Sequence, residues 1–315
     1  MNRAVVSLPP DIARLGSFRA VLLLGTFAVL VAFFSVRSPF FFTLSNILNV
    51  AGELPEIGLL VVGLTFVIIA GGMDLSVGSV VGLAAAVLAL LCHTGLNIWI
   101  CVLLALLVGA ACGALNGLFV ACFKMQAVVV TVGTLVLFRG AVYVLTNGRP
   151  QSGFPEEFSF LGQGSLFGVP FNFLLLLAVA ISAHFALTRT VYGRRIFALG
   201  NNEEALRYSG APVTATRFTS FLLSGILAAG AGVLLASRLA SAQANTGQGF
   251  ELEAITAVLM GGVYIFGGRG TVAGAFIGLL IIVVLRNGLN VIGVSSVIET
   301  LILGILILVA VGAGR

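Results

Sequence analysis

Long apolar runs, separated by short polar stretches, make up most of this 315-residue sequence. An α-helix that crosses a bilayer needs about 20 apolar residues, and the runs recur at about that length. We therefore expect an all-α bundle of about ten transmembrane helices. They are predicted at residues 18–36, 53–70, 75–92, 99–123, 127–146, 171–187, 218–238, 252–266, 271–291 and 297–311.

One polar stretch, AGGMDLSVGS at residues 70–79, interrupts the apolar pattern between the second and third runs. Its glycines allow the backbone to leave helical geometry. Asp74, Ser76 and Ser79 can then reach groups that a continuous apolar helix excludes. This combination is typical of an interrupted helix beside a polar passage through the membrane.

The composition places the whole chain in a membrane. Hydrophobic residues make up 59% of the sequence and charged residues only 9%, with a mean hydropathy of +1.17. A water-soluble domain needs far more surface charge, so we expect a single transmembrane domain over residues 1–315. The net charge of +5 is better explained by attraction to the anionic inner leaflet than by nucleic-acid binding, because no basic patch interleaved with aromatic residues is present.

Basic residues predict the orientation, because Lys and Arg accumulate in short cytoplasmic loops. With an even number of crossings and a cytoplasmic N-terminus, only Arg37, Arg149 and Arg238 fall on the outer side. The inner side receives Arg3, Arg14, Arg19, Lys124, Arg189, Arg194, Arg195, Arg207, Arg217, Arg269 and Arg315. Both termini are therefore expected in the cytoplasm.

Glycine motifs recur in the two halves of the chain. The first half holds a double glycine at residues 71–72, followed by SVGSVVG and ALNGLFV, and the second half holds GGRGTVAGAFIG followed by LRNGLNV. Related halves around a central path are common in transporters. We interpret residues 45–146 and 218–311 as approximate repeats, although glycine-rich membrane helices also produce chance matches.

The longest polar segment expected in the cytoplasm is residues 188–217. It contains the signals for a short helix: a capping asparagine, acidic residues in the first turn, and a glycine and proline at the end. We expect an amphipathic helix parallel to the membrane that offers a rigid contact surface, and a solvated connector is the alternative. The signals are Asn201 or Asn202, Glu203, Glu204, Gly210 and Pro212.

No metal site is predicted. The four cysteines form no CxxC pair and have no histidine at ligand spacing, so we interpret them as small packing residues. His184 could relay protons, but a single buried imidazole is more often a packed core residue.

Four ordered motifs resemble a known family. They are GGMDLSVGSVVGLAA, GNNEEALRYSG, SRLASAQANTGQGFELEAITAVLMGG and GGRGTVAGAFIGLLIIVVLRNGLNVIGVSS. From about residue 44 onward the chain resembles the permease subunits of bacterial ribose-type monosaccharide ABC importers, with the nearest likeness to the ribose, rhamnose and autoinducer-2 permeases. It departs from the ribose-type pattern in GGVYIFGG, where Val263, Tyr264 and Phe266 stand at positions that are commonly smaller and more polar.

The resemblance implies a dimer of permease subunits, identical or related, in the bacterial inner membrane. It also implies a periplasmic sugar-binding protein outside and ABC ATPase subunits inside. The GNNEEALRYSG segment would be the coupling helix that docks on the ATPase. Its residues are Asn201, Asn202, Glu203, Glu204, Ala205, Arg207, Ser209 and Gly210.

The chain carries no phosphate-binding loop of its own. Its only lysine, Lys124, lies in CFKMQ, without the GxxxxGK[ST] context that cradles nucleotide phosphates. We therefore expect a non-catalytic permease without a cofactor, driven by a separate subunit that uses ATP and Mg²⁺.

The transport mechanism expected from these features is alternating access. A sugar loses its hydration water on entry, at a cost of a few kcal/mol for each hydroxyl, unless polar groups replace that water. For each candidate a structural role is the alternative, such as capping a helix or bonding across helices. The candidates for lining or gating the pathway are Asp74, Ser76, Ser79, Asn116, Gln243, Asn245, Glu251, Asn287 and Asn290.

Further charges lie near apolar segments, where they are costly unless paired or hydrated. We expect structural ion pairs, in which Arg139 or Arg286 meets an acidic side chain from another helix. The acidic side chains are Glu53, Glu56 and Glu299.

Two rival functions come from other classes. A proton-coupled secondary sugar carrier would need no partner subunits and would use Asp74, His184 or Glu299 as a titrating relay. An intramembrane enzyme is disfavoured, because the chain has neither an HExxH metal motif nor a GxSxG elbow.

Overall fold

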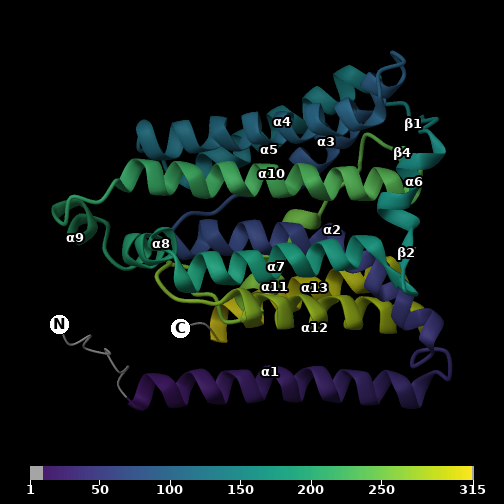
Figure 1. Ribbon diagram of the computed structural model, residues 1–315. Helices are drawn as coiled ribbons and strands as arrows, with labels where there is room; N and C mark the ends of the chain where they lie inside the picture. Colours follow the sequence, from purple (N-terminus) through teal and green to yellow (C-terminus); the bar gives the residue numbers. More distant parts are fainter. Residues whose placement is uncertain (1–9, 314–315) are drawn as a thin grey trace.

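The long helices lie side by side and form a bundle (Figure 1). This computed structural model describes residues 10–313. One end of the bundle carries α6 (Glu156–Gln163), β1 (Gln151–Ser152) and β4 (Ser241–Ala242), and we call it the α6 end. The opposite end, the α9 end, carries α8 (Val191–Asn201) and α9 (Glu203–Tyr208). The helices are α1 (Pro10–Arg37), α2 (Leu44–Ile69), α3 (Val77–Cys92), α4 (Ile98–Gly117), α5 (Ala127–Thr146), α6 (Glu156–Gln163), α7 (Phe171–Arg189), α8 (Val191–Asn201), α9 (Glu203–Tyr208), α10 (Val213–Leu239), α11 (Phe250–Met260), α12 (Val272–Val291) and α13 (Ser296–Ala313).

Regular structure other than α-helix is short. The π-helical turn η1 (Leu118–Cys122) continues α4. Two antiparallel pairs join β1 (Gln151–Ser152) to β4 (Ser241–Ala242) and β2 (Ser165–Leu166) to β3 (Val169–Pro170). The mainly helical class predicted from the sequence is confirmed.

Each of the ten predicted crossings overlaps a helix. Within residues 10–313, six helical segments are long and apolar enough to span a membrane: α2, α4 with η1, α5, α7, α10 and α12. The apolar parts of α1, α3 and α13 are shorter, and α11 has only 11 residues. The crossing predicted to reach residue 266 ends at Met260, because Gly261 and Gly262 follow it and Gly262 has a φ of +84°.

The centre of the bundle is α2. Its residues from Leu54 to Ile69 are all buried, and it packs against α7, α10, α11 and α12. A helix that is apolar on every side is stable only when other helices surround it. The sequence of α2 therefore explains its central position.

Small residues allow α10 to approach α4 closely. A Cβ atom at Gly225 of α10 would overlap the Gly109 carbonyl oxygen of α4 and lie 2.8 Å from the Gly113 Cα. Such close backbone contact is typical of helix interfaces in membranes. It places α10 between α4 and α2, as Figure 1 shows.

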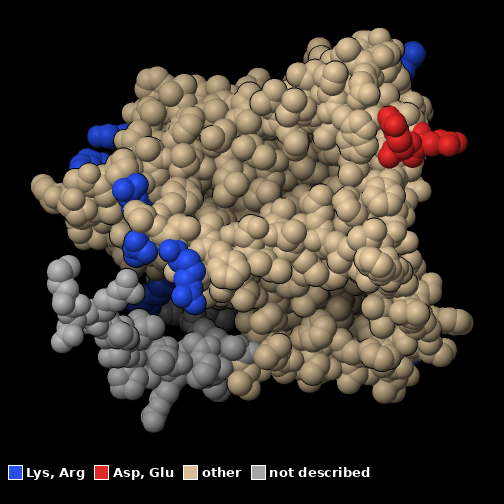
Figure 2. All heavy atoms as spheres, viewed as in Figure 1, with Lys and Arg blue, Asp and Glu red and all other residues tan. Residues whose placement is uncertain are grey.

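Charged side chains separate along the bundle. Most of the Lys and Arg side chains visible in Figure 2 lie toward the α9 end, and the visible acidic side chains lie at the α6 end. The exposed acidic residues Glu156 and Glu157 begin α6. The predicted inner-side residues Arg3 and Arg315 lie outside the described residues.

Candidate functional site

The break between α2 and α3 encloses Asp74. Gly71, with a φ of +79°, turns the chain out of α2. The Asp74 carboxyl group is buried and accepts hydrogen bonds from Ser76 N at 3.0 Å, Ser76 Oγ at 2.7 Å and Ser224 Oγ of α10 at 3.0 Å. The predicted interruption is confirmed, and its carboxyl group is occupied by donors of the chain itself.

Asn116 of α4 extends these contacts into a network across four helices. Its Nδ2 donates to Ser76 Oγ at 2.8 Å, and its Oδ1 accepts from Thr134 Oγ1 of α5 at 2.8 Å. Ser79 Oγ donates to the Ser76 carbonyl oxygen at 2.7 Å. We call Asp74, Ser76, Asn116, Thr134 and Ser224 the Asp74 network. It brings together four predicted pathway residues, counting Ser79, as mutually bonded groups that link α3, α4, α5 and α10.

A polar pocket of about 300 Å³ lies in the half of the bundle nearer the α6 end. Its walls come from the first part of α2, the last parts of α10 and α12, and the segment 240–249 that precedes α11. The volume is at the lower limit of small-molecule sites. The polar lining residues are Glu53, Glu56, Arg238, Gln243, Asn245, Thr246, Gln248 and Arg286.

Ion pairs neutralise both arginines of the polar pocket. Glu56, 4% exposed, accepts hydrogen bonds from Arg238 Nε and from Arg238 Nη2, the second at 3.1 Å. Arg286 bridges Glu253 at 3.1 Å and Glu299 at 2.9 Å. The expected pairing of Arg286 with an acid is confirmed, and charges in a low-dielectric interior persist only when paired in this way.

The other predicted pathway residues have separate positions. Asn287 and Asn46 exchange two amide hydrogen bonds at 2.8 and 3.0 Å. Asn290 is exposed near the end of α12. Glu251 accepts from Gly249 N at 3.2 Å through Oε1, whereas its buried Oε2 has no hydrogen-bond partner among the described residues.

Several lining residues were not predicted for the pathway. Glu56 was noted only as a charge near an apolar run and Arg238 only as a basic residue of the outer side, and their pairing joins positions 182 residues apart. Thr246 and Gln248 belong to QANTGQG, whose other amides, Gln243 and Asn245, were predicted. The density of polar residues in that segment was the signal that could have found them.

Two helices occupy the polar segment 188–217, where one was predicted. The first is α8, in which Thr190 Oγ1 accepts from Gly193 N at 3.1 Å. Asn202 then caps α9, because its Oδ1 accepts from Ala205 N at 3.0 Å. Of the two candidate caps, Asn202 is therefore the cap and Asn201 is the last residue of α8.

Glu203 ties α9 to the start of α10. It accepts hydrogen bonds from Arg217 at 2.6 Å and from Arg207 at 2.5 Å. The Arg217 hydrogen bond is the main reason that the pKa of Glu203 lies below its ordinary value of 4.5, against the opposing effect of partial burial. Glu203 thus stabilises the segment internally.

The outward surface of α9 is left to other residues. Tyr208 is 90% exposed, and Glu204 has no ion-pair partner among the described residues. The remaining exposed residues of the predicted coupling segment are Asn201, Asn202, Ala205, Arg207, Ser209 and Gly210.

At its end, α8 is attached to the membrane core. Gly268 N donates to the Ile69 carbonyl oxygen at 2.8 Å, and Asn201 Nδ2 donates to the Gly268 carbonyl oxygen at 3.0 Å. A Cβ atom at Gly200 would overlap both Ile69 O and Gly268 N. Because Ile69 ends α2, α8 touches the chain immediately before the break that contains Asp74.

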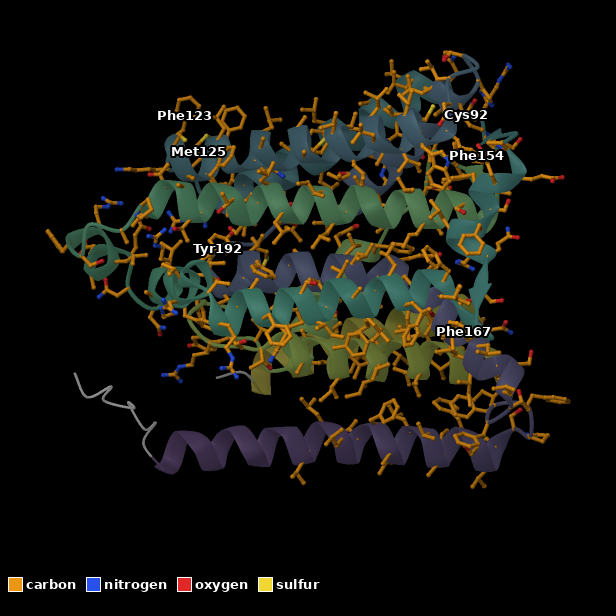
Figure 3. All side chains as sticks on the ribbon, viewed as in Figure 1. Cys92, Phe123, Met125, Phe154, Phe167 and Tyr192 are labelled. Carbon is orange, nitrogen blue, oxygen red and sulfur yellow. The ribbon has the colours of Figure 1, made fainter. Side chains whose placement is uncertain are left out.

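Tyr192 provides a second attachment of α8. Its ring stacks on Phe66 of α2 with a centroid distance of 6.3 Å, and its hydroxyl accepts from Thr219 Oγ1 of α10 at 3.0 Å. Figure 3 labels Tyr192 where α8 meets these two helices. Tyr192 therefore connects α8 to both α2 and α10.

Other singled-out residues lie away from the polar pocket. Val263 is buried and Phe266 is exposed in the turn between α11 and α12, toward the α9 end, so this departure from the ribose-type pattern is remote from the pocket lining. His184 is exposed on α7, so its interpretation as a buried core residue is wrong. No group of three or more His, Cys, Asp or Glu side chains in residues 10–313 could hold a metal ion.

Comparison with known proteins identifies the family. Residues 46–311 match the family described as branched-chain amino acid transport system / permease component. The ribose import permease of Haemophilus influenzae is 40% identical over 258 residues, which cover 81% of this chain and 80% of that protein. No solved structure matches the chain.

Two further relatives are similar over comparable lengths. The autoinducer 2 import system permease of Enterobacter sp. is 37% identical over 84% of this chain and 75% of its own. The L-arabinose transport system permease of Escherichia coli is 35% identical over 82% of this chain and 79% of its own. The chain therefore belongs to the branched-chain amino acid transport system / permease component family and is a membrane transport permease.

Proposed function

We propose that this chain is the permease subunit of an ABC importer that moves a monosaccharide or sugar-like solute across the bacterial inner membrane. The observation that carries the proposal is its 35 to 40% identity to the ribose, autoinducer 2 and L-arabinose permeases over about four fifths of the chain. The polar pocket supports it, because a hydroxyl-rich solute needs polar groups in place of its hydration water.

We further propose about ten crossings, with residues 1–315 as one transmembrane domain and residues 45–146 and 218–311 as related halves. The α9 end faces the cytoplasm, since Lys124 follows η1, Arg189 ends α7 and Arg194 lies in α8, all at that end. Both termini then face the cytoplasm, and the polar pocket lies toward the periplasm.

The proposed partners rest on the similarity to import permeases, and the chain's lack of a phosphate-binding loop is consistent with a separate ATPase. Separate ABC ATPase subunits bind ATP and Mg²⁺ at the cytoplasmic face, a periplasmic binding protein delivers the solute, and a second permease subunit completes the membrane unit. The chain itself is non-catalytic and needs no cofactor. Binding by the ATPase displaces α8 and α9, and the contacts of Gly268 and Tyr192 pass the movement to α2 and α10.

ATPase docking tests this proposal. Glu204→Lys and Tyr208→Ala change the exposed surface of α9. Among the described residues, neither side chain makes a hydrogen bond or an ion pair that the substitution would remove. We expect each to weaken binding of the purified ATPase subunit at least tenfold in a pull-down titration, with unchanged thermal stability of the permease.

The matched control is Glu157→Lys, an exposed acid at the α6 end. It makes the same charge change on the opposite side of the membrane, so ATPase binding is expected to stay at the wild-type level. Unchanged binding by both α9 variants, or equal loss in the control, would contradict docking on this surface.

A further inference from the structure

Arg139 of α5 holds two separate segments together through their backbones. Its Nη1 donates to the carbonyl oxygens of Ala244 at 3.1 Å and Thr246 at 2.7 Å, and its Nη2 donates to the Gly78 carbonyl oxygen at 3.2 Å. Gly78 lies in the first turn of α3, whereas Ala244 and Thr246 belong to the segment 240–249. The guanidinium has no ion-pair partner among residues 10–313.

The segment that Arg139 holds is also the wall of the polar pocket. Four polar residues of this segment line the pocket: Gln243, Asn245, Thr246 and Gln248. Gln243 N donates a hydrogen bond to Thr246 Oγ1 at 2.9 Å, which fixes the local turn. The Arg139 guanidinium binds the backbone carbonyl groups of the same segment, at Ala244 and Thr246. Arg139 is therefore a side chain of another helix that fixes this wall, beyond the pairing of β4 with β1 at residues 241–242.

No space remains between the held segments. A Cβ atom at Gly78 would lie 2.5 Å from the Gly247 carbonyl oxygen, and a Cβ atom at Gly247 would lie 2.5 Å from the Gly78 carbonyl oxygen. Two glycines thus let α3 and the pocket wall touch through their backbones. The segment 240–249 thus lines the pocket and also contacts the first turns of α3.

An alternative partner for Arg139 lies beside this contact. The Cβ atom added at Gly78 would overlap Glu251 Oε2, the buried carboxylate oxygen without a hydrogen-bond partner among the described residues. A guanidinium and a carboxylate form strong bidentate pairs, yet here they flank the Gly78–Gly247 contact without bonding. The pair offers Arg139 a second arrangement that would replace its carbonyl bonds.

We propose that Arg139 is the positioning residue of a gate formed by the segment 240–249. Bound to the three carbonyls, it latches the segment against α3 and keeps the polar pocket closed on that side. Transfer of the guanidinium to Glu251 releases the segment and opens the pocket during the transport cycle. Such exchange between two discrete arrangements is how packed interiors switch. The inference rests on the proposed transport function, because it assigns the pocket to the solute pathway.

The test places a reporter in the pocket wall. In a variant whose native cysteines are replaced by alanine, Ala244→Cys is labelled with a membrane-impermeant maleimide in proteoliposomes that contain the permease, its ATPase and its binding protein, because Ala244 is buried while the segment is held against α3. Arg139→Gln is expected to raise the resting labelling rate at least fivefold and to lower solute uptake per ATP hydrolysed at least fivefold. Arg139→Lys is expected to lie between Arg139→Gln and the wild type in both the resting labelling rate and the uptake per ATP hydrolysed, because lysine keeps the charge but has fewer donors.

Glu251→Gln tests the second arrangement. It leaves the carbonyl bonds of Arg139 intact, so resting labelling is expected to match the wild type, whereas the increase in labelling during ATP hydrolysis is expected to disappear together with uptake. The control is Arg149→Gln, an exposed arginine that does not line the pocket; both readouts are expected to remain at the wild-type level.

The outcomes separate the gate from the function. Wild-type labelling and uptake in Arg139→Gln would overturn the latch, and turnover-dependent labelling that persists in Glu251→Gln would overturn the exchange. If the wild-type complex takes up no sugar while Arg139→Gln still opens the pocket, the proposed function fails and the latch stands.

Discussion

Replacing Asp74 tests whether the polar groups in the α2–α3 break stabilise the fold. In Asp74→Ala three donors, the Ser76 amide and the Ser76 and Ser224 hydroxyls, lose their acceptor inside a buried site. Each buried donor left without a partner costs about 1–3 kcal/mol, so the free energy of unfolding should fall by roughly 3–9 kcal/mol. Asp74→Asn keeps one acceptor oxygen for Ser76 and should cost less than about 2 kcal/mol.

Unfolding in detergent can be followed with a thiol-reactive dye, because Cys101 and Cys112 are buried in the folded chain. Ser224→Ala alone should lower the free energy of unfolding by about 1 kcal/mol. The same substitution made in Asp74→Ala should lower it by clearly less, because the hydrogen bond between the two residues is already lost. Gln126→Ala is the control, because this exposed amide makes no capping hydrogen bond. Equal stability of Asp74→Ala and Gln126→Ala, or strict additivity with Ser224→Ala, would refute the reasoning.

Three further predictions concern the α9 end and the polar pocket. Gly200→Ala should push α8 away from Ile69 and reduce uptake per ATP hydrolysed at least threefold in the reconstituted complex, whereas an unchanged ratio would show that this contact does not couple the two processes. The lowered pKa of Glu203 means that its contribution to stability is present above the ordinary pKa of 4.5 and is lost as the pH falls below that value. The melting temperatures of wild type and Glu203→Gln should therefore differ at pH 7 and converge in acid. A difference in melting temperature that grows in acid would contradict this role of Glu203. Arg286→Met leaves two carboxylates of other helices unpaired and should lower the free energy of unfolding by about 1–3 kcal/mol. This is less than the cost of breaking a fully buried pair, because the arginine is partly exposed. A melting temperature equal to that of Arg149→Met would contradict the prediction.

The sequence predicted the helical segments because apolar runs of membrane length leave few alternatives. It also predicted the interruption at Asp74, since glycine and a carboxylate inside an apolar run have no role in a continuous helix. The α8 helix was missed, because its apolar residues Ile196 and Leu199 lie among arginines in a segment that resembled a polar loop.

The polar pocket was only partly predictable. Gln243 and Asn245 were found because they belong to a dense polar stretch, but the pairing of Glu56 with Arg238 joins two distant helices and depends on how they pack. The partner of Arg139 was also beyond sequence reasoning. Opposite charges suggest ion pairs, whereas backbone carbonyls carry no signature in the residue types.

Reconstituted transport tests the central claim most directly. Uptake of the labelled sugar that the binding protein carries is measured in proteoliposomes that contain this chain alone, the chain with its ATPase, and the chain with ATPase and binding protein. The account predicts accumulation only in the complete system and only with hydrolysable ATP. Accumulation by the chain alone, with or without a pH gradient, would contradict it.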